Sequence, residues 1–171
     1  MLDRKSWMRA TLVLSVGLMV LVVLRAIRTR SSSGDISGYE RTAVFFSDGD
    51  GAELGTARVR IADTDAKRYV GLSRTESLRE GEGMLFVHPC EQSVSYVMRE
   101  MSFPLDIVFV DEDRTVTDVY HAELPADGLA DSELERYDGR AKYVLELPYQ
   151  YTSERGIGVG DRIRSASDRD I

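Results

Sequence analysis

The sequence predicts a mainly β (α+β) protein: a small antiparallel, partly closed β-barrel with one or two short helices, preceded by a single N-terminal transmembrane helix. Three observations favour this fold class. The chain has 171 residues, enough for one ordinary domain and an appendage. A run of uncharged, mostly apolar residues lies near its start. Short apolar runs bounded by Gly and Asp fill the remainder, without the strand–helix alternation of a doubly wound sheet.

Residues 1–30 are predicted to be a membrane anchor with basic flanks. The uncharged run covers residues 10–24, and Arg9 and Arg25 can snorkel, which brings the usable length to roughly 18 to 20 residues. A cleaved secretory signal and a buried or peripheral helix are the alternatives. Three Lys or Arg lie on each side, so the charge bias does not fix the orientation. We expect a single-pass protein that contacts the membrane through residues 10–27, with its domain outside the cell.

A flexible linker is expected at residues 31–40, because this stretch is polar and contains glycine. The β-rich domain follows at 41–165, and residues 166–171 form a polar tail. The domain begins with a predicted hairpin, in which strands at 43–47 and 53–63 flank the turn residues DGDG.

A short helix is predicted at residues 65–70, because Thr64 is a suitable N-cap and Gly71 suits its end. DEDR, residues 111–114, reads as a turn, residues 125–140 as a long polar surface loop, and residues 149–155 as a second short helix. Further strands are expected at 84–88, 93–98, 105–110, 115–122, 142–147 and 161–164.

The charge of the domain argues against nucleic-acid binding. Residues 31–171 hold 16 Lys and Arg against 28 Asp and Glu, and only two of the cations are lysines. Such an acidic surface repels phosphate backbones. Acid excess and scarce lysine indicate adaptation to concentrated salt, as in halophilic proteins, where screening relieves self-repulsion. A surface evolved to capture a cationic partner is the alternative interpretation.

Two carboxylates interrupt apolar strands. Asp106 lies within LDIVFV, on the same face as Val108 and Val110, and Glu146 lies within YVLELP beside Val144. A buried carboxylate needs a partner, so each is expected to bond to an arginine, to backbone N–H groups or to a polar ligand.

The order of several motifs resembles the domain of unknown function 192, also called uncharacterised protein family 0127. The motifs are RYVGL at 68–72, GMLFVH at 83–88, FPLDIVFVD at 103–111, YVLELP at 143–148 and GIGVGDRI at 156–163. The resemblance covers roughly residues 57–164. It implies a compact β-rich domain, often found behind a signal or membrane segment, with no established activity and therefore no catalytic residues to transfer.

The chain departs from this family pattern at three places. Ser73 stands where the family has Met, Gln150 stands where the family has Gly, and the family's aromatic, Trp, Met, Lys, Asn, Thr run is replaced by residues 96–101. A ligand pocket shared by the family would therefore be altered here. The predicted pocket comprises Asp106, Glu146, Arg68, Met98, Arg99 and Tyr96.

The favoured function is a membrane-tethered acidic β domain that binds a small ligand or an envelope partner outside the cell without catalysis. The alternatives are a hydrolase that acts on an envelope polymer through Asp106 and Glu146, and a structural accessory domain of a membrane complex. No cofactor or metal site is expected, because His88, Cys90 and His121 are the only soft ligands and a metal would need more. Cys90 is expected to be a buried, small apolar residue.

Overall fold

The computed structural model describes residues 38–166. The predicted anchor at 1–30, its membrane contact through 10–27 and nearly all of the linker and the tail lie outside the described residues. Within 38–166, no helix has the length and apolar character needed to cross a bilayer.

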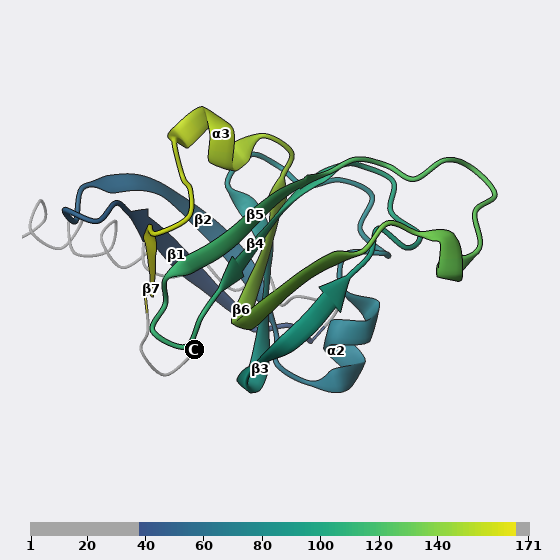
Figure 1. Ribbon diagram of the computed structural model, residues 1–171, viewed down its shortest axis with the longest axis horizontal. Coiled ribbons are helices and arrows are strands. Elements are labelled where there is room, and N and C mark those ends of the chain that lie inside the picture. The colour runs from purple at the N-terminus through teal and green to yellow at the C-terminus, as the bar shows by residue number, and fades with distance from the viewer. Residues whose placement is uncertain (1–37, 167–171) are drawn as a thin grey trace, which may run out of the picture. The chain divides into compact units, whose positions relative to one another are not determined.

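The described part of the chain is mainly β, as predicted, with short helices α2 (Asp65–Val70) and α3 (Tyr151–Arg155) and a single 3₁₀ turn at Asp131–Glu133. One seven-stranded sheet has the order β5-β4-β6-β3-β2-β1-β7 (Figure 1). Its strands are β1 (Arg41–Ser47), β2 (Glu53–Ala62), β3 (Glu82–Tyr96), β4 (Leu105–Val110), β5 (Val116–Ala122), β6 (Tyr137–Pro148) and β7 (Arg162–Ser165).

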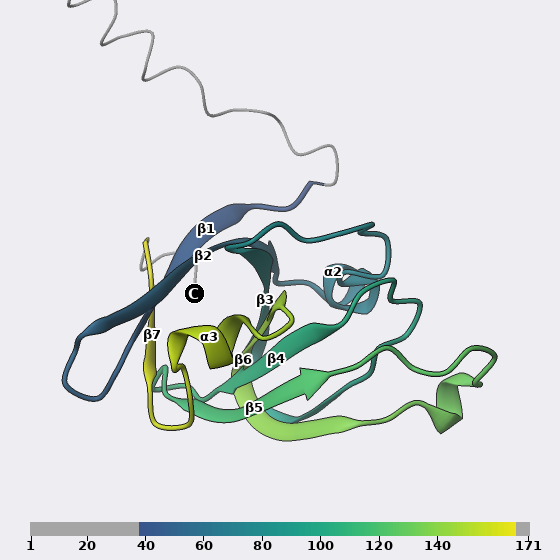
Figure 2. The same cartoon turned by 90° about the horizontal axis from the view of Figure 1, so that it is seen from above.

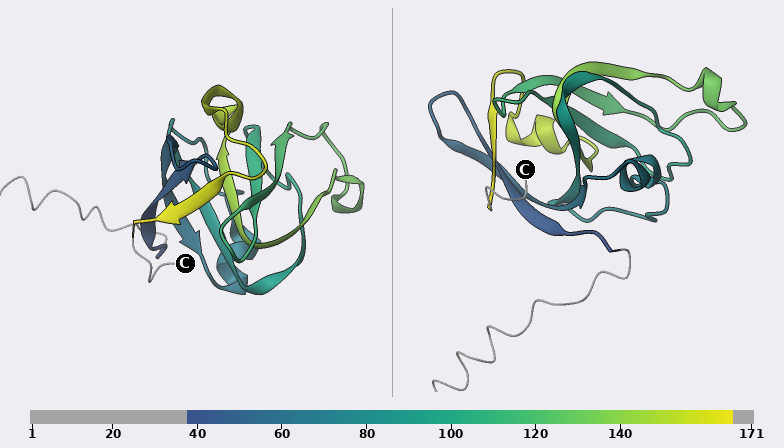
Figure 3. Two further views of the ribbon diagram at one scale, coloured as in Figure 1. Left: turned by 60° about the vertical axis from the view of Figure 1, so that its left-hand side comes forward. Right: turned by 90° about the horizontal axis from the view of Figure 1, so that it is seen from below.

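The sheet curls into a half-barrel whose two edge strands meet at one end (Figure 2). An isolated antiparallel bridge joins Thr115, just before β5, to Arg162 at the start of β7. Backbone bonds from Val116 N to Asp161 O, 2.8 Å, and from Ile163 N to Arg114 O, 2.9 Å, extend this contact. Helix α3 covers one end of the curled sheet (Figure 3). The prediction of a partly closed barrel is therefore confirmed.

The prediction that every pair is antiparallel was wrong for β2 and β3. These strands run parallel, in a register that extends from Arg58 opposite Glu82 to Ala62 opposite Phe86. A parallel pair needs a crossover of a dozen residues or more, and residues 63–81, which contain α2, provide it. The sequence shows two strands and a short helix there, but nothing local sets their relative direction.

Strand β3 is continuous where two separate strands, at 84–88 and 93–98, were predicted. Its register to β6 shifts between Val87 and Gln92, so the His88-Pro89-Cys90 stretch lies in a bulge. A bulge leaves residues without ladder hydrogen bonds, which makes room for a proline. The same bulge turns Cys90 outward, so the prediction of a buried cysteine was wrong.

Helix α2 forms over the predicted residues because its caps are satisfied. The Thr64 hydroxyl accepts a hydrogen bond from Lys67 N, 3.3 Å, and Gly71 adopts a φ of +51° after the last turn. By contrast, β6 begins at Tyr137, inside the predicted surface loop 125–140, so that loop is shorter than expected.

Both faces of β4 and β6 are covered by apolar side chains. Val108 and Leu145 belong to one buried cluster, whereas Ile107, Phe109 and Val144 belong to a second. All six residues of β4 are buried as a result. Any polar side chain on these two strands must therefore find its partners inside the protein.

Candidate functional site

Asp106 is completely buried, as the sequence predicted, and four donors surround its two oxygens. Gln150 N donates to Oδ1 over 2.9 Å, and His121 Nδ1 lies 2.7 Å from the same oxygen. Thr152 donates to Oδ2 twice, from its backbone N over 2.8 Å and from Oγ1 over 2.6 Å. These bonds offset the cost of burying the carboxylate. Backbone N–H groups, which were among the predicted partners, thus bond to Asp106 together with the Thr152 and His121 side chains, and no arginine does.

Asp106 and Glu146 do not share a site. Asp106 is directly opposite Leu147 in the β4–β6 register, and Glu146 is directly opposite Ile107. Opposed residues of an antiparallel pair point to the same face, and successive residues point to opposite faces. The two carboxylates therefore project from opposite faces of the sheet, and the predicted pocket that combined them was wrong in this respect.

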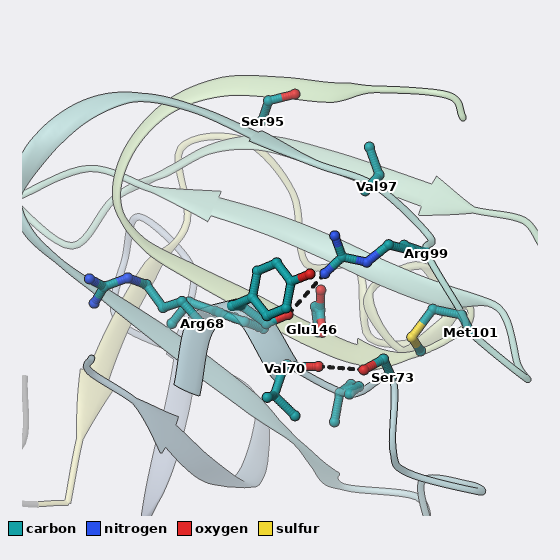
Figure 4. A pocket seen from close by; sticks show the side chains of 12 residues that line it. Arg68, Val70, Ser73, Ser95, Val97, Arg99, Met101 and Glu146 are labelled. Atoms are coloured by element: carbon teal, nitrogen blue, oxygen red, sulfur yellow. Dashed lines mark hydrogen bonds between the residues drawn. The ribbon is translucent and has the colours of Figure 1, made fainter. Parts of the chain in front are cut away.

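Glu146 lines a cavity of about 210 Å³ on its face of the sheet. Most of the wall is built by residues 68–73, at the end of α2 and just after it, and by Ser95, Val97, Arg99 and Met101, at the end of β3 and beyond it. Figure 4 shows Glu146 in the middle of this lining with Arg99 beside it. The lining also includes Arg68, Tyr69, Leu72, Phe86 and Met101.

The carboxyl group of Glu146 is buried without a full set of hydrogen bonds. Its residue is 7% exposed, and Oε2 has no hydrogen-bond partner among the described residues. Burial raises the pKa of this carboxyl group to about 8, although the charge of Arg60 acts in the opposite direction. At neutral pH the group is therefore mostly protonated and can both donate and accept a hydrogen bond.

The two predicted arginines line the cavity in different ways. Arg68 is held by Val87 O, 2.6 Å from Nη1, and by an ion pair with Asp65. Its guanidinium points away from Glu146 (Figure 4). Arg99 bonds to Tyr69 O over 3.1 Å and lies 4.4 Å over the Tyr69 ring. Arg99 is therefore the cation placed to meet a ligand.

The remaining predicted residues, Tyr96 and Met98, lie outside the cavity. Tyr96 borders an adjoining hollow of about 350 Å³ together with Arg68 and His88, and its Oη lies 3.1 Å from His88 Nε2. Burial, with the nearby charge of Glu146, raises the pKa of Tyr96. Met98 is buried in the second apolar cluster and borders a separate hollow beside Tyr137. The structure thus brings Arg68, Arg99 and Glu146 together, with Tyr96 beside them.

Sequence reasoning missed His121 as the partner of Asp106. Counting outward from the predicted turn at 111–114 places Asp106 opposite Val119, and a register shift between Phe109 and Val110 moves its partner to His121, so no local signal identifies this residue. Sequence reasoning also missed Tyr69 and Ser73 in the cavity wall, for which no local signal is present. No group of three His, Cys, Asp or Glu side chains suited to a metal ion occurs within residues 38–166.

Comparison with known proteins places these features in a wider group. The family model DUF192, described as Uncharacterized ACR, matches residues 47–165. A UPF0127 protein of Thermococcus sibiricus is 30% identical over 118 residues, which cover 65% of this chain and 68% of that protein.

Two crystal structures share the fold. One, titled a putative transcription regulator from Sinorhizobium meliloti, has a TM-score of 0.68 at 24% identity and covers 78% of this chain and 98% of its own. The other, a protein of unknown function from Novosphingobium aromaticivorans, has a TM-score of 0.64 at 26% identity, with coverages of 75% and 88%.

Proposed function

The chain belongs to the DUF192 family, whose description assigns no activity, and from its own geometry we propose that it binds a small organic acid in the Glu146 cavity without catalysis. One observation carries the proposal: a buried carboxyl oxygen, Glu146 Oε2, has no partner within the described residues and belongs to a side chain that lines the cavity. Leaving a buried polar atom unbonded costs about 1–3 kcal/mol, which a suitable ligand recovers.

The chemistry of the lining selects the ligand class. A protonated Glu146 can donate to one oxygen of a carboxylate, and Arg99 can provide the positive charge. Leu72, Phe86 and Met101 give the cavity an apolar part. A volume of about 210 Å³ suits a small ligand, so we propose a short monocarboxylate.

The cellular placement is a further part of the proposal. The uncharged run at residues 10–24 supports a single-pass anchor, and the acid excess of residues 31–171 supports a domain that faces concentrated salt outside the cell. Expression of the full chain in cells, followed by membrane fractionation and protease treatment of intact cells, tests both points. A chain recovered with the soluble fraction, or one protected from the protease, contradicts this placement.

Ligand binding is tested by calorimetry on the full chain against a series of straight-chain and aromatic monocarboxylates at about pH 6, where Glu146 is protonated. Arg99→Gln is expected to weaken binding about tenfold, the equivalent of one charge-assisted hydrogen bond. Arg58→Gln changes an exposed arginine of β2 that does not line the cavity and is the matched control. Failure of every carboxylate to bind, or equal binding by Arg99→Gln, refutes the proposal.

The two alternative functions have less support. The hydrolase hypothesis needs Asp106 and Glu146 across one opening, whereas the β4–β6 register directs them to opposite faces. No contact of the described residues favours a structural accessory role over ligand binding. We therefore do not propose either.

A further inference from the structure

Three side chains from separate elements form a continuous hydrogen-bonded line on the Asp106 face of the sheet. Asp106 Oδ1 in β4 lies 2.7 Å from His121 Nδ1 in β5. His121 Nε2 lies 3.1 Å from Ser153 Oγ in α3. The order of groups is carboxylate, imidazole and hydroxyl, which is the arrangement that activates a serine nucleophile.

The partners of Asp106 fix the direction of these bonds. A carboxylate only accepts hydrogen bonds, so His121 Nδ1 must carry the proton that points to Oδ1. In the neutral ring Nε2 then has a free lone pair, and it accepts the hydrogen of the Ser153 hydroxyl. This is the tautomer that a general base for Ser153 requires.

Asp106 is buried, whereas His121 and Ser153 reach the solvent. Asp106 is 0% exposed and is held by Gln150 and Thr152 as well as by His121. The side chain of His121 is 42% exposed, and Ser153 is exposed. A reactant can thus approach the Ser153 hydroxyl from solvent, while the buried carboxylate of Asp106 fixes the position of His121.

A structural role accounts for only part of this geometry. To hold α3 on the sheet, Asp106 needs its bonds to Gln150 and Thr152, both from the first residues of that helix and its cap. The His121–Ser153 bond is on the solvent side and satisfies no buried group. The Tyr149 ring packs edge-on against His121 at 6.1 Å, which further restricts the imidazole.

We propose that Ser153 is a His121-activated nucleophile and that this site hydrolyses carboxylic esters presented at the protein surface. Ser153 Oγ adds to the ester carbonyl carbon while its proton passes to His121 Nε2. The bond from carbon to the leaving alkoxide breaks, and His121 returns the proton to that alkoxide, which leaves as an alcohol. Water then repeats both steps on the acyl-serine, releasing the carboxylic acid and free Ser153.

This site is separate from the Glu146 cavity, because Asp106 and Glu146 project from opposite faces. Asp106 touches no reacting atom and is a positioning residue. His121 and Ser153 are the catalytic pair. The inference therefore does not depend on the proposed carboxylate binding.

The test is labelling of the full chain with a fluorophosphonate probe, in which the serine oxygen replaces fluoride on phosphorus. Intact mass and peptide mapping are expected to show one adduct, at Ser153, and hydrolysis of a p-nitrophenyl ester should accompany it. Ser153→Ala is expected to abolish both. Ser132→Ala, which alters another exposed serine in a short helical turn, is the control and should label like the parent chain.

A second variant tests the role of the imidazole. His121→Gln keeps a hydrogen-bonding side chain and is expected to slow labelling about 100-fold, the usual contribution of a general base. The Asp106→Asn variant should change the tautomer of His121, which its ¹⁵N shifts report, and should slow labelling of Ser153 in parallel. A role confined to holding α3 predicts no such link between tautomer and labelling rate. A known serine protease, labelled in parallel, shows that the probe is active. The proposal is overturned if the chain then forms no adduct, if another residue is labelled, or if His121→Gln is labelled as fast as the parent chain.

Discussion

Asp106 and Glu146 lie on neighbouring, directly paired strands and yet face opposite sides of the sheet. Asp106 opposes Leu147, whereas Glu146 opposes Ile107. The carboxylate of Asp106 is surrounded by donors, whereas Glu146 Oε2 has no partner among the described residues. The two acidic side chains therefore have different environments. One face therefore carries the Ser153–His121 pair and the other carries the cavity, and each can be altered by mutation while the other serves as the internal control.

Replacing Glu146 by Gln should remove a pH dependence from the stability. The pKa of this carboxyl group is about 8 in the folded chain, against 4.5 for an ordinary glutamate side chain. Between these values the unfolded chain has released the proton and the folded chain has kept it, so stability falls as pH rises from about 4.5 to about 8. The fall is on the order of a few kcal/mol. Gln does not titrate, so the Glu146→Gln variant lacks this loss of stability.

Urea unfolding of the full chain at a series of pH values measures this effect. The stability of Glu146→Gln relative to the parent chain should rise steadily across that window and level off above it. Glu112→Gln, on an exposed turn, corrects for the change in net charge. Parallel pH profiles for the parent chain and Glu146→Gln would show that the carboxyl group does not hold its proton in the folded state.

Removing the Asp106 carboxylate should be strongly destabilising. Asp106→Ala leaves the backbone N–H groups of Gln150 and Thr152 without their acceptor and opens a space at a completely buried position. We expect a loss of about 3–5 kcal/mol in the free energy of unfolding. Urea denaturation measures it, with Asp113→Ala in an exposed turn expected to change stability by less than about 0.5 kcal/mol. A similar small change for both variants would contradict the role assigned to Asp106.

The sequence could predict what depends on neighbouring residues. Helix α2 has its cap, its stop and its six residues adjacent in the chain, and the turn at 111–114 joins β4 to β5 as an antiparallel pair, although the register of that pair also depends on a shift between Phe109 and Val110. The burial of Asp106 also followed, because alternation within one strand places it with Val108 and Val110. These features require no knowledge of distant contacts.

The remaining features depend on contacts between distant segments. The parallel pairing of β2 with β3 is set by packing after a long crossover. The faces of Asp106 and Glu146 depend on the β4–β6 register, which a shift of one residue would reverse. The donors from Gln150 and Thr152 are 44 and 46 residues away from Asp106 in sequence. For this reason the two carboxylates were found from the sequence but their separate sites were not.

Glycine should be more favourable than glutamine at position 150. It has a φ of +65°, in the left-handed region, and its N–H bonds to Asp106. That conformation costs a non-glycine residue about 1–2 kcal/mol, while the greater freedom of glycine in the unfolded chain offsets roughly half of the gain. Gln150→Gly is therefore expected to stabilise the protein by about 0.5–1 kcal/mol.

Thermal unfolding of the full chain compares this variant with its converse. Gly156→Ala introduces a side chain at a φ of +67°, where nothing lies within 4 Å to clash with it, and should destabilise by about the same amount. Opposite signs for the two variants isolate the backbone conformation as the cause. A lower melting temperature for Gln150→Gly would mean instead that the glutamine side chain stabilises the start of α3.

Gly139 should not tolerate even a methyl group, because the Phe109 ring occupies the space. A Cβ at this position would lie 2.5 Å from Phe109 Cδ1. The ring is 0% exposed and packs between Tyr96 and Tyr120, at centroid distances of 5.9 and 5.6 Å, so it has nowhere to move. Gly139→Ala is expected to cost about 1–3 kcal/mol in urea unfolding, as overpacking of a dense core does.

A double-mutant cycle separates this steric cause from a general cost of alanine in β6. Phe109→Leu replaces the rigid ring by a shorter side chain that lacks Cε1 and can rotate away from the new methyl group. Gly139→Ala should therefore cost less in the Phe109→Leu background than in the parent chain, with a coupling above about 0.5 kcal/mol. Gly158→Ala, with nothing within 4 Å and no positive φ, should leave stability nearly unchanged. Additive effects of the two substitutions would rule out the contact between Gly139 and Phe109 as the reason for a glycine in this strand.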